Sequence, residues 1–359
     1  MLKLARGGAG QLLDLAQSLR PGPDDPVVPQ RLVRQFALPE GCTVTGPVKR
    51  EKRRVELQNV DSVCGMAPEA FRRRTPFSDL VALDPAERIR LSVTGDPSMR
   101  IIDLIAPVGK GTRGLIVSPP KAGKTLLLEA MANSIRAANP EVRVLMLLID
   151  ERPEEVTHIR RSVDAEVLAR TNDQSPQEQV ELVEMVLAMV RVELECGRDI
   201  AILVDSLTRI GRAFNIKGSG TRRTMSGGME AGALEVPRRL FGLARNIENG
   251  GSVTILATAL VDTGSQMDQL IFQEFKGTGN SEVILDRKLA ELRIFPAINI
   301  LESGTRKEER LYSAEEIAKI ALIRRGLADR NFKDATEKML ELIKKHATNE
   351  ALLNSIPAV

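Results

Sequence analysis

Aromatic residues are scarce in this chain of 359 residues, which has no tryptophan, one tyrosine and an aromatic content of only 3%. Stacked aromatic rings supply much of the affinity for single-stranded nucleic acid, so a recognition surface built mainly on stacking is disfavoured. Histidine is equally sparse, and the isolated His158 and His346 predict neither a metal site nor a catalytic triad. Cys42, Cys64 and Cys196 show no metal-ligand spacing, so we expect reduced thiols and a cytoplasmic protein.

Long apolar runs are also missing. No segment approaches the roughly 18 uninterrupted apolar residues of a membrane helix, and Asp14 and Gln17 interrupt the short apolar stretch at the N-terminus, which does not resemble a signal peptide. The net charge of +3 is uneven, with a net of +4 in residues 1–90 and −1 in the rest. The basic runs at 49–54 and 72–74 favour contact with a polyanion but are equally typical of a solvated face.

The N-terminal part of the chain differs from the remainder in its composition and in its pattern of apolar residues. Residues 1–20 contain a short helical pattern, and residues 27–63 favour short strands separated by turns. Proline and arginine are frequent further on, as is typical of a linker. We therefore predict a small β module over residues 1–65, a linker over 66–100 and a main domain over 101–359.

The main domain alternates apolar runs with helical patterns. Four runs predict buried strands, at residues 114–117, 143–149, 200–204 and 252–256. A three-four spacing of apolar residues predicts a long helix over 176–196, and the patterns at 313–316 and 334–337 predict capping boxes that begin two C-terminal helices. Continuous apolar strands alternating with helices indicate an α/β domain whose mostly parallel sheet is covered on both faces.

The strongest functional signal is the segment Ser118-Pro-Pro-Lys-Ala-Gly-Lys-Thr125, which directly follows a predicted strand and begins a helix. A triphosphate needs a tight loop of converging backbone N–H groups, a lysine for the β- and γ-phosphates and a hydroxyl for Mg²⁺. Gly123, Lys124 and Thr125 provide these features. Ser118 stands where the general pattern begins with glycine, and a small residue suffices there. The segment therefore predicts a phosphate-binding loop for ATP and Mg²⁺.

Two acidic positions follow predicted strands. Asp205 ends the strand at 200–204, and a carboxylate at the carboxyl end of a parallel strand faces the crevice where ligands bind. We expect it to hold Mg²⁺ through water, the alternative being a cap of the strand end. Glu151, or Asp150 beside it, is the candidate for orienting the attacking water at the γ-phosphate.

Three polar, glycine-rich loops remain, at residues 217–228, 262–268 and 303–309. Any one of them has the composition of an ordinary surface turn. Long structureless loops in a compact α/β domain are usually functional or disordered, so we treat all three as candidate functional loops.

Five segments together resemble the Rho family of bacterial transcription terminators, namely residues 119–125, 147–157, 205–209, 274–280 and 303–309. The resemblance extends from Asp24 to Arg330. It implies a RecA-like P-loop ATPase domain preceded by an oligonucleotide-binding (OB, or cold-shock-like) β module. It further implies a homohexameric ring that threads single-stranded RNA through its centre, uses ATP hydrolysis to translocate and releases nascent RNA from RNA polymerase.

The resemblance also implies site residues. The catalytic residues are Lys121, Lys124, Glu151, Arg152, Asp205 and, reaching the ATP of a neighbouring subunit, Arg306. The nucleotide contacts are Pro119, Pro120, Lys121, Ala122, Gly123, Lys124, Thr125 and Leu126, with Phe295 stacked on the adenine and Mg²⁺ held at Thr125 and Asp205. The RNA contacts in the central pore are Arg222, Arg223, Thr224, Ser226, Gly227, Thr263, Gly264, Ser265 and Gln266.

Two departures from the family pattern bear on RNA binding. The Gly-Phe-Gly-Phe stretch of the family's OB barrel is absent, Val27 stands where an aromatic residue is typical, and Phe36 is the only aromatic residue before Phe71. We therefore expect a truncated primary RNA site that binds weakly. Gln266 stands where the family's pore loop often has a lysine. Arg222 and Arg223 in the other pore loop can supply the positive charge that is missing there.

Two alternative functions follow. One is a Rho-like ring that hydrolyses ATP but has lost efficient RNA capture and translocation. The other is a subunit of a rotary ATP synthase, which shares the core fold but not the Glu-Arg-Pro-Glu-Glu segment at 151–155 or the arginine-rich pore loop.

Overall fold

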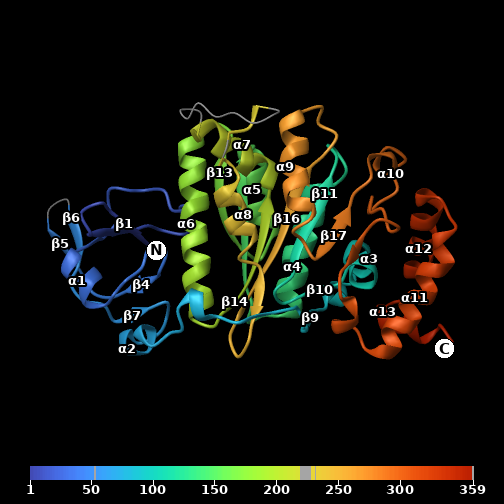
Figure 1. The fold of residues 1–359 in the computed structure, drawn as a ribbon, viewed down its shortest axis with the longest axis horizontal. Coiled ribbons are helices and arrows are strands. Elements are labelled where there is room, and N and C mark those ends of the chain that lie inside the picture. The colour runs from blue at the N-terminus through green and yellow to red at the C-terminus, as the bar shows by residue number, and fades with distance from the viewer. Residues whose placement is uncertain (52–53, 219–227, 231, 358–359) are drawn as a thin grey trace.

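A nine-stranded sheet forms the centre of the computed structural model, which describes residues 1–51, 54–218, 228–230 and 232–357 (Figure 1). Six strands run parallel, in the order β13 (Glu166–Thr171), β12 (Arg143–Glu151), β14 (Asp199–Asp205), β16 (Ser252–Leu260), β11 (Arg113–Ser118) and β17 (Ser281–Ile284). The antiparallel strands are β18 (Gly304–Thr305) next to β17, β15 (Arg245–Ile247) next to β16, and β8 (Ala82–Leu83) next to β15. The four predicted strands and their parallel arrangement are confirmed.

Helices cover both faces of this sheet, because successive residues of each strand point to opposite sides. In β12, Val144, Met146 and Leu148 belong to one buried cluster, whereas Leu145, Leu147 and Ile149 belong to another. The first cluster packs against α3 (Pro97–Ile105), α4 (Lys124–Ala138), α5 (Pro153–Ser162), α11 (Ala314–Ala328) and α12 (Phe332–Lys345). The second packs against α6 (Pro176–Glu195), α7 (Leu207–Gly218), α8 (Glu235–Phe241) and α9 (Gln266–Lys276).

The predicted capping boxes have different outcomes. Ser313 and Glu316 form the expected box at the start of α11. The box predicted at 334–337 is wrong, because α12 begins earlier and Asn331 caps it by accepting a hydrogen bond of 3.0 Å from the backbone N–H of Asp334. The remaining C-terminal helices are α10 (Arg287–Glu291) and α13 (Asn349–Asn354).

The N-terminal module is a second, smaller sheet, which Figure 1 shows beside α6. Its strands lie in the order β1 (Leu2–Leu4), β2 (Gly10–Leu12), β3 (Val27–Val28), β6 (Arg54–Leu57) and β5 (Val48–Glu51), with β4 (Val44–Thr45) and β7 (Ser62–Val63) paired separately. The helix expected in residues 1–20 is wrong. Gly8, at φ +78°, helps to turn the chain between β1 and β2, whose pairing matches Leu2 with Leu12. The module also contains the helices α1 (Gln30–Gln35) and α2 (Pro68–Arg72), which the strand pattern did not predict.

The module packs directly on α6. Gly41, at φ +87°, lies so close to this helix that a Cβ atom there would come within 2.4 Å of the Met189 backbone nitrogen. Ion pairs of 2.9 Å join Lys3 to Glu181 and Arg74 to Glu195. The first residues of the chain belong to the main core as well as to the module, because the side chains of Met1, Leu13 and Leu19 are buried in the same cluster as α6.

The segment predicted as a linker contains regular structure. It holds the 3-10 turns η1 (Phe77–Asp79) and η2 (Leu91–Thr94), the edge strand β8 and the strand β9 (Arg88–Ile89), which pairs with β10 (Val108–Gly109). Another such turn, η4 (Glu308–Arg310), follows β18. The domain boundaries at 65 and 100 stay predictions.

Candidate functional site: a phosphate-binding loop and its carboxylates

The phosphate-binding loop connects the buried β11 to α4, as the sequence predicts. Lys121 at φ +66° and Gly123 at φ +90° both adopt left-handed backbone conformations, so the chain turns sharply before α4 begins at Lys124. A helix N-terminus carries unpaired N–H groups and a positive dipole end, which together favour a phosphate. The side chains of Lys121 and Leu126 are exposed.

Lys124 brings the two predicted carboxylates together. Its Nζ lies 3.1 Å from Glu151 Oε1 and 2.5 Å from Asp205 Oδ1. Both carboxylates are buried, with side-chain exposures of 2% and 1%. Because β12, β14 and β11 are near neighbours in the parallel sheet, their carboxyl ends place the three side chains at one edge.

Asp205 has the environment of a cation ligand. Its Oδ1 accepts a hydrogen bond of 3.0 Å from Thr258 Oγ1, whereas its buried Oδ2 has no hydrogen-bond partner among the described residues. Burial raises the pKa of Asp205, an effect that the neighbouring Lys124 opposes and the Glu151 carboxylate reinforces. An unpaired carboxylate oxygen suits Mg²⁺ or one of its water ligands, so the site fits the expected metal ion.

Geometry favours Glu151 over Asp150 as the carboxylate for the attacking water. The pairing of β12 with β13 shifts register between Ile149 and Glu151, so that Glu151 faces the phosphate-binding loop. Such irregularities commonly re-aim a side chain next to a functional site. Asp150, at φ +60°, has no ion pair with Lys124.

Arg209 is a site residue that the sequence reasoning did not select. Its Nη1 lies 3.1 Å from Glu151 Oε2 and also donates to the backbone carbonyl of Asp150. The available signal was its position four residues after Asp205, one turn into the following helix α7. Arg152, which was selected, occupies the N-cap position of α5, where its exposed side chain makes no capping hydrogen bond.

A cavity of about 370 Å³ adjoins the phosphate-binding loop. Phe295 lines it with a half-exposed ring, opposite Gly123 and Leu126. The start of α3 forms another wall, where Asp96 caps the helix and lies beside Pro97 and Ser98. The size, the apolar lining and the position next to the loop suit a nucleotide base.

The predicted RNA contacts divide into two groups. Arg222, Arg223, Thr224, Ser226 and Gly227 lie outside the described residues. The other group, Thr263, Gly264, Ser265 and Gln266, forms the turn between β16 and α9.

Two residues that the sequence did not single out support this turn. Thr263 Oγ1 donates to Asp268 at 2.6 Å, and the buried Asp268 carboxylate accepts two hydrogen bonds from Arg212 on α7. Hydrogen bonding to Asp268 raises the pKa of Arg212. The turn is thus held rigidly against α7.

Arg306 does not join the phosphate site within one chain. It follows the edge strand β18, two strands away from β11. Its side chain is exposed and has no hydrogen bond or ion pair in the described part of the chain, although its backbone N–H donates to Asn280. Arg306 and Asn280 both line a second cavity of about 290 Å³.

Comparison with known proteins places the chain in a family. It is 45% identical to the transcription termination factor Rho of Cereibacter sphaeroides, over 99% of this chain and 86% of that protein. Rho of Pseudomonas aeruginosa gives 45% identity over 99% of this chain and 87% of that one. Rho of Streptomyces lividans gives 48% identity over 94% of this chain but only 48% of its own length. The chain belongs to the Rho family.

Membership of the Rho family agrees with the fold. The family model described as the nucleotide-binding domain of the ATP synthase alpha/beta family matches residues 98–305. An ATPase from the type III secretion system of pathogenic bacteria superposes with a TM-score of 0.65 at 21% identity, covering 77% of this chain and 85% of that one. The RecA-like α/β fold is confirmed, and the chain is an ATPase by family. In the described residues no helix is long and apolar enough to cross a membrane.

Proposed function

We propose that this protein is an ATP-hydrolysing transcription termination factor that works as a hexameric ring, moves along single-stranded RNA and releases transcripts from RNA polymerase. The observation that carries the proposal is the cluster of Lys124, Glu151 and Asp205 at the phosphate-binding loop. The identity with Rho proteins over nearly the whole chain supports the RNA-directed part and disfavours a rotary ATP synthase subunit.

The cluster suggests how ATP binding prepares the site for hydrolysis. Lys124 forms ion pairs with both carboxylates, and Glu151 is held between Lys124 and Arg209. The β- and γ-phosphates of bound ATP compete with the two carboxylates for Lys124. When Lys124 moves to the phosphates, Glu151 is released to orient the attacking water. Mg²⁺, held at Thr125 and Asp205, would neutralise charge that develops on the phosphate oxygens.

The position of Arg306 supports the proposal that the subunits assemble into a ring. Arg306 is exposed, has no side-chain partner among the described residues and lies on the sheet edge away from its own phosphate loop, so it is placed to reach a site on another subunit. Arginines supplied in this way stabilise the charge of phosphoryl-transfer transition states. We therefore assign Arg306 to the ATP of the neighbouring subunit, and the turn at 263–265 with the first residue of α9, Gln266, to the RNA in the pore.

The experiment is ATP turnover by the full-length protein with and without homopolymeric RNA. We expect RNA to raise turnover severalfold in the wild type, and Lys124→Ala to show none in either condition. An ATP turnover that is the same with and without RNA would favour the second candidate, an ATPase ring without RNA capture. One observation favours that candidate: no aromatic side chain of residues 1–76 is exposed, since Phe71 is buried and Phe36 packs against the module's core.

A further inference from the structure

Helix α3 connects two parts of the molecule that the proposed function uses separately. Its first turn, with Asp96, Pro97 and Ser98, lines the cavity assigned to the base. Its last turn ends at Ile105, whose backbone oxygen would lie 3.9 Å from a Cβ atom at Gly304, two residues before Arg306. A helix of this length is about 13 Å long at 1.5 Å per residue, so a short rigid rod separates the two.

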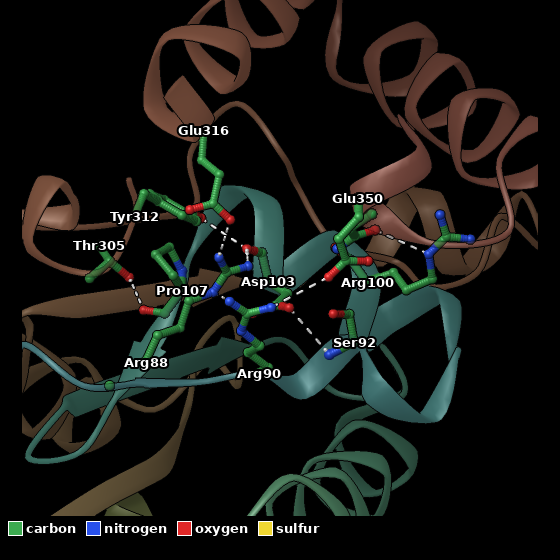
Figure 2. Close-up of polar contacts among 12 residues, drawn as sticks. Arg88, Arg90, Ser92, Arg100, Asp103, Pro107, Thr305, Tyr312, Glu316 and Glu350 are labelled. Carbon is green, nitrogen blue, oxygen red and sulfur yellow. Dashed lines mark hydrogen bonds and ion pairs between the residues drawn. The ribbon is translucent and has the colours of Figure 1, made fainter. Parts of the chain in front are cut away.

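Three backbone carbonyls at or just beyond the C-terminal end of α3 accept hydrogen bonds from side chains of residues 305–324, and Figure 2 shows two of these contacts. Tyr312 Oη donates to the carbonyl of Asp103 at 2.9 Å, and Thr305 Oγ1 donates to that of Pro107 at 2.9 Å. Arg324 Nη2 donates to the carbonyl of Ile105 at 2.9 Å and is paired with Glu308. The last carbonyls of a helix have no partner within it, so these contacts fix the segment to α3 from residue 305 to residue 312.

A buried ion cluster holds the same junction. Arg88 Nε lies 3.1 Å from Asp103 Oδ1, and its Nη1 lies 3.2 Å from Glu316 Oε1. The Arg88 guanidinium also stacks over the Tyr312 ring, at 4.6 Å from its centre. Figure 2 shows these side chains converging on the end of α3 from three directions. Asp103 is fully buried, so this charge is compensated only as long as Arg88 and the neighbouring donors stay in place.

Arg306 lies within this anchored segment but takes no part in the anchoring. Thr305 before it and Glu308 after it are tied down, whereas the Arg306 side chain extends into solvent. The backbone is thus held on both sides of Arg306, whereas the Arg306 side chain is not held. We expect this arrangement where a protein must present one side chain accurately to another molecule.

We propose that Tyr312, Thr305 and the Arg88–Asp103 pair are positioning residues that hold Arg306, through helix α3, at the geometry needed for hydrolysis on the neighbouring subunit. The proposal rests on the assignment of Arg306 to the neighbour's ATP. It adds that the base cavity of one subunit and the arginine offered to the next belong to one rigid unit.

The test uses Tyr312→Phe, which removes the hydroxyl and keeps the ring over Arg88. We expect kcat for ATP in the full-length ring to fall on the order of 10- to 100-fold, because small displacements of a catalytic group have effects of that size. The KM for ATP should stay unchanged, because the variant does not touch the base cavity or the phosphate loop. Asn349→Ala is the matched control: Asn349 exchanges buried hydrogen bonds with Arg100 on the same helix but has no contact with the Arg306 segment. It should leave kcat unchanged.

Thr305→Val provides an independent variant that retains Tyr312. Since the chain has no tryptophan and no other tyrosine, tyrosine emission reports on Tyr312 alone. We expect Thr305→Val to lower kcat while this emission stays like that of the wild type, which shows that the ion cluster is intact.

The decisive comparison is made in an Arg306→Ala background. If the positioning residues act through Arg306, adding Tyr312→Phe to Arg306→Ala should cause no further loss. A further loss by the same factor as in the wild type, or an equal fall of kcat in Asn349→Ala, would overturn the positioning role and leave the proposed function standing. An Arg306→Ala ring with undiminished turnover would overturn the assignment of Arg306 itself, and the positioning role with it.

Discussion

The phosphate site and the N-terminal module use charge in opposite ways. At the phosphate site, the buried Glu151 and Asp205 are both paired with Lys124, whose side chain is largely buried. In the module, the basic residues lie on the surface: Arg50 pairs with Asp24 and Arg54 with Glu56, with most of both arginine side chains exposed. A buried cluster depends strongly on each member, whereas exposed pairs contribute little and are screened by salt.

The two regions also differ in what they offer a ligand. The phosphate site combines a preformed loop, an unpaired carboxylate oxygen and an aromatic ring at the base cavity. The described residues of the module offer a basic surface without exposed aromatic rings. We therefore expect ATP recognition to be specific and preorganised, and RNA capture by the module to rest on phosphate contacts, which are insensitive to sequence.

The largest effect is expected at the phosphate site. Lys124→Ala removes the charge that contacts the β- and γ-phosphates and should abolish ATP hydrolysis, as measured by phosphate release. Lys121→Ala is the matched control, since that lysine is exposed and has no ion pair among the described residues; it should have a smaller effect. Circular dichroism should show both variants folded. Measurable turnover in folded Lys124→Ala would remove the basis of the assignment.

The next largest effect is expected at the interface between subunits. Arg306→Ala should bind ATP normally and lose turnover on the order of 10³-fold, as happens with other arginines that act on a neighbour's phosphates. Mixing Arg306→Ala with Glu151→Gln subunits should restore part of the activity, because some interfaces then combine two intact halves. The absence of rescue at every mixing ratio would contradict a shared site.

A gain of function is expected in the module if aromatic rings are what it lacks. Val27→Phe places a ring at a half-buried position on β3. It should tighten binding of single-stranded RNA by about 1–3 kcal/mol, the contribution of stacking on one base. Val81→Phe, at an exposed position beside β8, serves as the control and should leave affinity unchanged. Fluorescence anisotropy of a labelled oligonucleotide measures both, and equal affinities for Val27→Phe and the wild type would show that stacking is not the missing element.

The smallest expected effect is on the thermal stability of the folded protein. It compares a buried charge, at Asp205, with an exposed one, at Arg54. Because burial raises the pKa of Asp205 above its ordinary value of 3.8, the folded protein binds this proton more tightly than the unfolded chain. The wild type therefore loses stability as pH rises from 3.8 through the folded-state pKa, and Asp205→Asn should avoid that loss. Without nucleotide, the thermal midpoint of Asp205→Asn relative to that of the wild type should therefore rise between acid and neutral pH. Arg54→Ala, at an exposed pair, should show no such pH dependence, and a relative midpoint of Asp205→Asn that falls over this range would refute the buried-charge explanation.

The sequence predicted the parts of this molecule whose cause is local. Four buried strands, the long α6 and the loop at 118–125 follow from apolar periodicity and from the spacing of glycine, lysine and threonine. The hairpin of β1 and β2 was missed, because apolar residues spaced as in a helix pack here against α6 and β13, which lie far along the chain. Tertiary contacts of this kind override local propensity.

The candidate site shows the same limit. Lys124, Glu151 and Asp205 could be selected because each stands at a recognisable place after a strand. Arg209 could not, since its value comes from a contact with Glu151 across the sheet edge. Similarly, Asp268 ends the polar loop predicted at 262–268, and only its place in α9 and its pairing with Arg212 show that it supports the turn before this helix.

The most direct test of the account measures RNA-stimulated ATP turnover by the full-length protein, with cytosine and adenine homopolymers over a range of salt concentrations. The full chain is required because Met1, Leu13 and Leu19 are buried in the main core. The account predicts that both polymers stimulate turnover to a similar extent and that the RNA concentration for half-maximal stimulation rises steeply with salt. Stimulation that is selective for cytosine and persists at physiological salt would contradict it.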